Sequence, residues 1–130
     1  MNKLKAKIVS EKYSDGLGRI EALCGDYLFR LLVFGQNGAL RNQNEAYLLI
    51  KESEVAISKS KHTDISISNK VECRVASIQK GTILCELGLE FNDERLTSII
   101  TTESTERLGL TVGETVFALI KANEIYLEEI

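Results

Sequence analysis

LIKESEV, at residues 49–55, returns as LIKANEI at residues 119–125, and this echo organises the whole chain. A second echo lies upstream of each heptapeptide, where NKLKAKIVS at residues 2–10 aligns with NKVECRVAS at residues 69–77. The two copies are offset by 67 residues upstream and by 70 residues downstream, so short loop insertions must accommodate the difference. An internal repeat of this kind predicts two tandem copies of one small structural unit.

The repeat divides the 130-residue chain into three parts. We expect a first repeat at 1–58, a polar linker at 59–64 and a second repeat at 65–130. Each repeat is too small to bury a large core alone, so we expect the two to pack on each other and on other protomers.

Within each repeat the apolar pattern is typical of short β-strands. Alternation predicts the first strand at 4–9 and its counterpart at 71–75. The spacing of turn residues predicts further strands at 17–24, 27–33, 45–51 and 54–58, with counterparts at 82–91, 95–101, 114–121 and 124–128. One helical turn is expected at 102–108, capped by Thr101 or Thr102 and closed by Gly109. These elements predict an all-β protein of two tandem small OB-like Greek-key barrels with a short helical turn.

The charge balance argues against a nucleic-acid or membrane partner. The net charge is −3 and the isoelectric point is about 5.3, so the overall field does not attract polyanions. No apolar run approaches the roughly 18 residues that span a bilayer, and the first residues alternate charged with apolar side chains. We therefore expect a soluble, cytoplasmic protein.

Cysteine and histidine do not form a recognisable site. Cys24, Cys73 and Cys85 contain no Cys-x-x-Cys pair, and His62 is the one histidine of the chain. A Cys–His nucleophilic pair is formally open, but the spacing favours buried thiols that pack in a core. No acid–base pair or metal cluster is visible, so we expect a protein that is not an enzyme and has no direct metal-cation ligands.

Three motifs of the second repeat carry chemistry. Residues 66–70 read SISNK, residues 101–104 read TTES at the start of the expected helix, and residues 118–122 read ALIKA. In this order and spacing they resemble the molybdate-binding Mop domain, also called TOBE. That domain occurs in molbindins, in the C-terminal part of the molybdate-responsive transcription regulator and in molybdate-transporter ATPases. The likeness covers essentially all of residues 65–128, and the first repeat is a degenerate relative.

The resemblance implies a function in molybdenum homeostasis. The expected ligand is molybdate or tungstate, bound reversibly for intracellular storage, buffering or sensing. It also implies an oxyanion site made of Ser66, Ile67, Ser68, Asn69, Thr101, Ser104, Lys121 and Ala122, with Lys51 as a weaker secondary candidate.

The residue chemistry agrees with an oxyanion ligand. A tetrahedral dianion needs hydrogen-bond donors that converge from several directions, and the Thr101 and Ser104 hydroxyls with the Lys121 ammonium are donors of that kind. Plainer roles stay open, because Thr101 and Ser104 can simply cap a helix and Lys121 can be a surface lysine.

Two departures from the family pattern bear on this site. Ser68 stands where the family motif Ser-Ala-Arg-Asn has arginine, so the site is weaker, or Lys70 substitutes, or the arginine mainly supports the loop. In the first repeat the Thr-x-x-Ser positions align with FGQN at residues 34–37, and of the site only Lys51 survives. We therefore expect one competent class of site, built on the second repeat.

The resemblance also implies partners. Two-repeat relatives assemble as dimers or trimers, so we expect a homo-oligomer with the anion at a subunit interface. The alternative is an anion-responsive regulatory or oligomerisation module that acts on a transporter or transcription partner. A nucleic-acid-binding OB protein is a further alternative, with Tyr13, Tyr27, Tyr47 and Phe29 as a stacking platform, but no basic stripe accompanies these rings.

Overall fold

The computed structural model describes residues 1–34, 44–62 and 64–130, and these residues form an all-β protein with one short α-helix. The predicted fold class is confirmed. In chain order the described elements are β1 (Asn2–Ser14), β2 (Leu17–Cys24), β3 (Tyr27–Phe34), β4 (Glu45–Ile50), η1 (Glu52–Glu54), β5 (Ala56–Ser58), β6 (Asn69–Lys80), β7 (Leu84–Phe91), β8 (Glu94–Thr101), α1 (Thr102–Leu108), β9 (Thr115–Ile120), η2 (Ala122–Glu124) and β10 (Ile125–Glu129).

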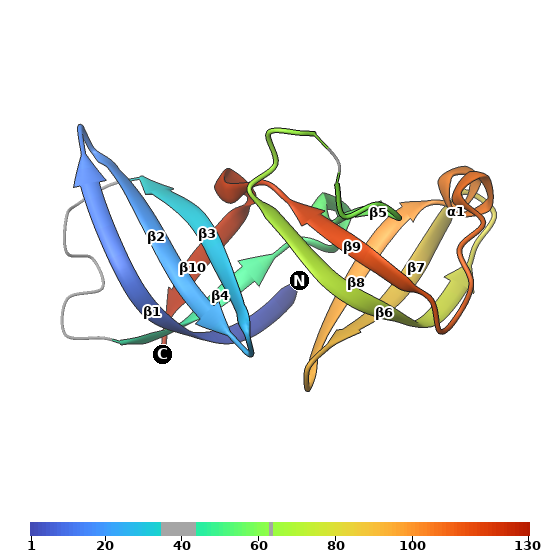
Figure 1. Cartoon of the computed structure of the whole chain (residues 1–130), viewed down its shortest axis with the longest axis horizontal. Helices are drawn as coiled ribbons and strands as arrows, with labels where there is room; N and C mark the ends of the chain where they lie inside the picture. The colour runs from blue at the N-terminus through green and yellow to red at the C-terminus, as the bar shows by residue number, and fades with distance from the viewer. Residues whose placement is uncertain (35–43, 63) are drawn as a thin grey trace.

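The strands form two antiparallel sheets of five. The strand order is β10-β4-β1-β2-β3 in the first sheet and β5-β9-β6-β7-β8 in the second. If β10 is left out of the first sheet and β5 out of the second, the orders read 4-1-2-3 and 9-6-7-8. This is the Greek-key arrangement. Figure 1 shows the two sheets next to each other, each strongly curved.

The outermost strand of each sheet comes from the other repeat. β10 pairs with β4 of the first sheet, with Ile125 opposite Ile50, and β5 pairs with β9 of the second sheet, with Ile57 opposite Ala118. In Figure 1 the red β10 accordingly lies among the blue and green strands of the first repeat. The exchange ties the two repeats together, and the boundaries at 58 and 65 stay a prediction about the sequence units.

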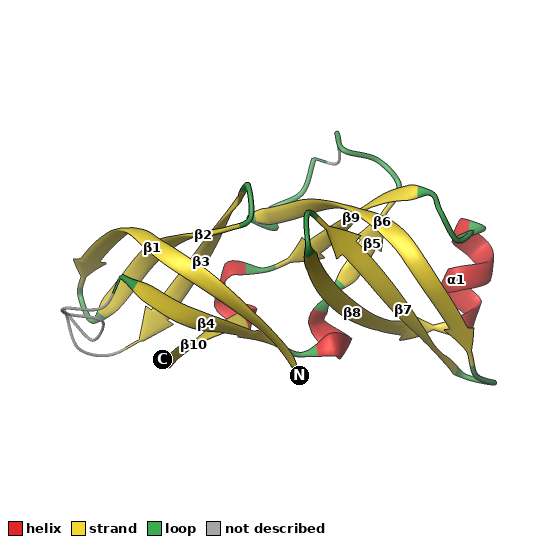
Figure 2. Cartoon of the chain, turned by 90° about the horizontal axis from the view of Figure 1, so that it is seen from below, coloured by secondary structure: helices red, strands yellow, loops and turns green. Residues whose placement is uncertain are grey.

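A short 3-10 helix precedes each exchanged strand. The sequence predicted strands from residues 54 and 124, and this was wrong, since β5 begins at Ala56 and β10 at Ile125. The Lys51 carbonyl accepts from the Glu54 N–H at 2.9 Å, and the Lys121 carbonyl accepts from the Glu124 N–H at 3.0 Å. These tight turns redirect the chain from one sheet to the other, and Figure 2 shows both of them where the sheets meet.

The first strand of each repeat is longer than its alternation predicts. β1 covers 13 residues and β6 covers 12 residues, whereas the expected strands were 4–9 and 71–75. The pairing register shifts between Ile8 and Ser10 and again between Val75 and Ser77. Such a β-bulge bends a strand and changes which side chains face the core, so the alternation of apolar residues ends before the strand does.

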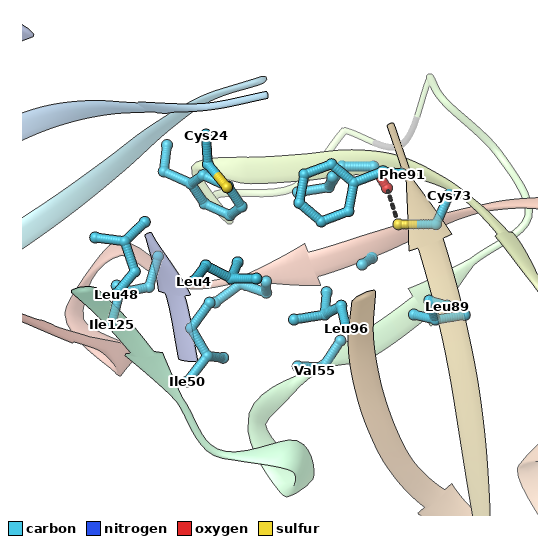
Figure 3. Packing of buried hydrophobic residues seen from close by; sticks show 14 of the residues in the cluster. Leu4, Cys24, Leu48, Ile50, Val55, Cys73, Leu89, Phe91, Leu96 and Ile125 are labelled. Carbon is cyan, nitrogen blue, oxygen red and sulfur yellow. Dashed lines mark hydrogen bonds between the residues drawn. The ribbon is translucent and has the colours of Figure 1, made fainter. Parts of the chain in front are cut away.

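The apolar core is continuous from one sheet to the other. Leu4 and Ile50 of the first sheet and Leu96 of the second are buried in one cluster with Val55 and Ile125. Figure 3 shows these side chains between the strands of both sheets. Because Val55 and Ile125 come from the connections that cross between the sheets, the exchanged segments also contribute to the core.

The β2–β3 and β7–β8 hairpin turns meet at the junction of the sheets. The Asn92 side-chain amide donates to the Asp26 carboxylate at 2.6 Å. Gly25 has φ 61°, and a Cβ atom on it would collide with the Asn92 amide. The left-handed backbone conformation therefore favours glycine at this turn, and a larger residue would also have to displace the Asn92 side chain.

The aromatic side chains named in the nucleic-acid alternative have packing roles. The Tyr27 and Phe29 rings meet edge to face at 4.7 Å, and Phe29 lies 6.2 Å from Phe91 across the junction. The Tyr27 hydroxyl accepts from the Lys70 N–H at 2.8 Å, and the Lys3 ammonium lies 4.3 Å from the centre of the Tyr47 ring. These contacts favour core and interface packing over base stacking.

The three cysteines are buried free thiols, as predicted. Burial raises the pKa of Cys24 and of Cys73 to about 12. Figure 3 shows Cys24 and Cys73 within the core, where the Cys73 thiol donates to the Val71 carbonyl at 3.3 Å. His62 is exposed in the linker and does not share the buried environment of the three thiols. Among the described residues no helix has the length and apolar character needed to cross a membrane.

Candidate functional site

The TTES segment ends β8 and begins α1. Thr101 is the N-cap of the helix, and its hydroxyl accepts from the Ser104 N–H at 3.0 Å and donates to the Ser104 hydroxyl at 2.8 Å. Gly109 closes the helix in the left-handed conformation, with φ 62°. The predicted helix bounds and both caps are confirmed. The Ser104 hydroxyl oxygen also accepts from Arg107 Nη2 at 3.3 Å, so the Ser104 hydroxyl proton is left to donate to another group.

Lys121 directly follows β9 and is the N-cap of η2. Its backbone is extended, with φ −70° and ψ 144°, and its side chain is exposed. Lys51 occupies the equivalent place before η1, with φ −67° and ψ 136°. The repeated LIK segments therefore set both lysines at matching points of the fold.

A groove of about 390 Å³ brings Ile67, Thr101, Ser104 and Lys121 together. It forms because β8 lies against the η1–β5 segment, where the Ser98 hydroxyl donates to the Val55 carbonyl at 2.6 Å, while β5 pairs with β9. One wall of the groove is thus the 53–56 segment of the first repeat. We call this cavity the polar groove.

The polar groove contains groups of both charges. The Lys121 ammonium and the hydroxyls of Thr101 and Ser104 are donors, whereas Glu54 and Glu124 place carboxylates on the same lining. One ammonium against two carboxylates does not make a strongly positive site. An anion in this groove needs further positive charge from outside it.

Ser68 and Ala122 line a neighbouring cavity of about 340 Å³. Each follows directly in sequence a residue of the polar groove, Ile67 and Lys121 respectively, so the 67–68 and 121–122 segments line both cavities. The opposite wall comes from the first repeat and includes Arg19 and Arg30, which the sequence analysis did not select. We call this cavity the arginine cavity.

Asn69 lines neither cavity, because its side chain is fully buried in a backbone network. Its amide donates to the Arg30 carbonyl at 2.8 Å and to the Ile120 carbonyl at 3.0 Å, and its oxygen accepts from the Arg30 N–H at 2.8 Å. Asn2, its equivalent in the first repeat, bonds the Thr97 N–H and carbonyl in the same way at 2.8 Å. Each asparagine thus joins its own repeat to the edge strand of the other sheet.

Ser66 and Lys51 complete the predicted set. Ser66 is exposed ahead of β6 and lines none of the cavities described above, and the Lys51 side chain is exposed as well. Of the aligned FGQN segment, Phe34 ends β3 and is 74% exposed, whereas residues 35–37 lie outside the described residues.

A third cavity, of about 360 Å³, occupies in the first sheet the place that corresponds to the polar groove. It lies between β3 and the η2–β10 segment, and Phe34, Tyr13, Tyr126 and Asn123 are among its lining residues. We call it the apolar cavity.

Comparison with known proteins decides the family. The TOBE domain family matches residues 65–127. Molybdenum-pterin-binding protein 1 of Clostridium pasteurianum is 34% identical over 64 residues, which cover 48% of this chain and 94% of that protein. The chain belongs to the TOBE (Mop) family. Molybdenum-pterin-binding protein 3 of the same organism is 33% identical over the same shares of the two chains.

A solved structure matches the fold of both repeats. The cytoplasmic molybdate-binding protein ModG, in a form with molybdate bound, matches with a TM-score of 0.91 and 22% identity. The match covers 99% of this chain and 96% of that one, so the two proteins share the fold over nearly their whole length. The relatives are described as binding proteins and not as enzymes. Within the described ranges no three His, Cys, Asp or Glu side chains gather as metal ligands.

Proposed function

We propose that this TOBE protein binds molybdate or tungstate reversibly, for storage, buffering or sensing in molybdenum homeostasis, without bond chemistry and in the cytoplasm. One observation carries the proposal, namely the convergence of Ile67, Thr101, Ser104 and Lys121 on the polar groove in a chain of this family. The names of the relatives, which are molybdenum-pterin-binding and molybdate-binding proteins, support the choice of ligand.

The chemistry of the ligand suits the donors in the groove. A tetrahedral dianion is held best by an ammonium and by neutral donors that approach from different sides. Lys121 provides the ammonium, and the Thr101 and Ser104 hydroxyls turn toward the anion by exchanging their mutual hydrogen bond for one to its oxygens. Ser66, Ser68 and Ala122 contribute hydroxyls and backbone N–H groups, while Asn69 positions this segment from its buried network.

The site is completed by a second protomer in a dimer or trimer. Glu54 and Glu124 leave the polar groove short of positive charge, which favours a further donor from another chain. Beside Thr101 the apolar side chains of Ile83 and Leu84 are 74% and 54% exposed. Large exposed apolar side chains of this kind are typical of protein interfaces, and here they adjoin the cap of α1.

Calorimetry on the full chain tests the proposal. We expect saturable binding of molybdate and of tungstate, and much weaker binding of sulfate, in a buffer free of phosphate. Light scattering on the same sample should give a mass of two or three chains. Absence of heat with both molybdate and tungstate, supported by unchanged thermal unfolding at millimolar anion, would reject the function.

A further inference from the structure

The arginine cavity has the composition of a second anion-binding site. Its lining combines Arg19, Arg30 and Leu32 of the first repeat with Ser68 and Ala122 of the second. In contrast to the polar groove, its lining contains no carboxylate among the residues that the structure describes. A space of about 340 Å³ between two guanidinium-bearing strands and a small hydroxyl residue is large enough for a tetrahedral oxyanion and its remaining water.

The two guanidiniums share one carboxylate. Glu21 lies opposite Arg30 in the β2–β3 pair, and its Oε2 is 3.7 Å from Arg30 Nε and 3.9 Å from Arg19 Nη2. Both separations exceed hydrogen-bond length, and neither arginine has another ion-pair partner among the described residues. The cluster therefore keeps one net positive charge and most of its donors for a ligand.

The position of Arg30 is fixed relative to Ser68. Asn69, which directly follows Ser68, bonds both the N–H and the carbonyl of Arg30 at 2.8 Å. Side-chain substitution of Arg30 leaves these backbone bonds in place. The arginine can thus be removed without removing the contact that joins the repeats.

We propose that Arg30 and Arg19 of the first repeat, together with Ser68, form an oxyanion subsite beside the polar groove. The inference rests on the proposed function and names residues for it that the sequence motifs do not contain. A guanidinium offers two parallel N–H donors to two oxygens of one tetrahedral anion, which suits the ligand class. In this way the first repeat supplies the guanidinium charge at the place where Ser68 replaces the arginine of the family motif.

Calorimetry with molybdate on four full-length variants tests the subsite. We expect R30Q to weaken binding at least tenfold or to abolish one class of site, R30K to fall between R30Q and wild type, and R19Q to weaken binding about threefold. E21Q removes the carboxylate that competes with the anion, so it should strengthen binding about threefold. A purely structural role of Arg30 would not produce opposite signs for R30Q and E21Q.

The matched control is R95Q. Arg95 is 72% exposed and paired with Glu90 at 3.1 Å on the second sheet, so the variant makes the same charge change away from the cavity. R95Q should bind as wild type does. If R30Q, thermally as stable as R95Q, binds molybdate equally well, the subsite is refuted while the proposed function stands. If wild type binds no oxyanion, both are refuted.

Discussion

The polar groove and the apolar cavity are two versions of one structural place. The polar groove lies between β8 and the η1–β5 segment, and the apolar cavity lies between β3 and the η2–β10 segment. Their volumes, about 390 and 360 Å³, are similar. Thr101 ends β8 where Phe34 ends β3, opposite Leu84 and Leu17 in the equivalent strands.

The difference shows that the fold and the ligand chemistry are separable in this chain. The strand order, the bulges, the 3-10 turns and the bridging asparagines recur in both halves, because backbone pairing and core packing require them. Among the described residues, Thr101, Ser104 and Lys121 line the polar groove, whereas Phe34, Tyr13, Tyr126 and Asn123 line the corresponding cavity of the first sheet. Four predictions test this separation, and the first two compare equivalent residues of the two halves.

The largest effect is expected from removal of a bridging asparagine. N69A leaves three backbone groups without partners in a fully buried place, and we expect a loss of roughly 3 kcal/mol in the free energy of unfolding. N2A removes the equivalent, half-buried bridge to Thr97 and should cost about 1 kcal/mol. Urea unfolding followed by circular dichroism measures both. An equal loss in the free energy of unfolding for the two variants would mean that the burial of the asparagine does not determine how much each bridge stabilises the protein.

The next effect is expected on ligand binding at the paired lysines. K121Q removes the ammonium of the polar groove and should weaken molybdate binding tenfold to a hundredfold, which is roughly 1.4–2.7 kcal/mol. K51Q changes the equivalent lysine before η1 and should leave affinity nearly unchanged. Calorimetry at one ionic strength provides the comparison. A larger loss in K51Q than in K121Q would place the competent site on the first repeat.

Cys24 of the first sheet and Cys73 of the second should make stability depend on pH in the alkaline range. The pKa of Cys24 and of Cys73 is about 12 in the folded protein, against an ordinary value of 9.0. Between these values the folded state retains protons that the unfolded state has lost. Stability is therefore full below pH 9 and falls toward pH 12, by about 1.4 kcal/mol per pH unit for each thiol.

Urea unfolding at pH 8 and pH 10 checks this dependence in wild type, C24A and C73A. Each variant should lose about half of this contribution, since one of the two thiols with a raised pKa remains. A pH dependence identical in all three proteins would assign the alkaline effect to other groups.

The smallest effect concerns the helix cap. T101V loses the hydroxyl that accepts from the Ser104 N–H and should lower stability by about 1 kcal/mol, whereas T101S keeps the cap. Molybdate affinity should fall several-fold in T101V and be largely retained in T101S. If T101V loses stability but keeps full affinity, Thr101 is a cap alone.

Much of the fold follows from the sequence because the repeat and its turn residues are local signals. The β2 strand at Leu17–Cys24 and the α1 helix with its Thr101 and Gly109 caps agree with the expected bounds. The ends of β1 and β6 differ from the expected bounds. A β-bulge in each strand changes which side chains face the solvent, so the alternation of apolar residues stops before the strand ends. The exchange of β5 and β10 between the sheets could not be predicted from the sequence. Either strand could pair with the equivalent edge of its own sheet, so its residues do not indicate which sheet it joins.

The candidate site was predictable where one repeat supplies it. Ile67, Thr101, Ser104 and Lys121 share a groove as their motif order suggested. Arg19 and Arg30 were missed because they belong to the other repeat and reach Ser68 only through the contact between repeats. The sequence held only an indirect signal for this contact between the repeats. Asn2 and Asn69 recur at equivalent positions, and a buried asparagine needs hydrogen-bond partners, which here are backbone groups of the other repeat.

Because β10 of the second repeat completes the first sheet, the first sheet can be completed only after the second repeat has been synthesised. The ribosome delivers residues 1–50 early, yet the free edge of β4 has no intramolecular cover until Ile125–Glu129 has been made. During translation this edge is open to pairing with a neighbouring nascent chain, and completion of the first sheet depends on a strand that is translated after all strands of the second sheet.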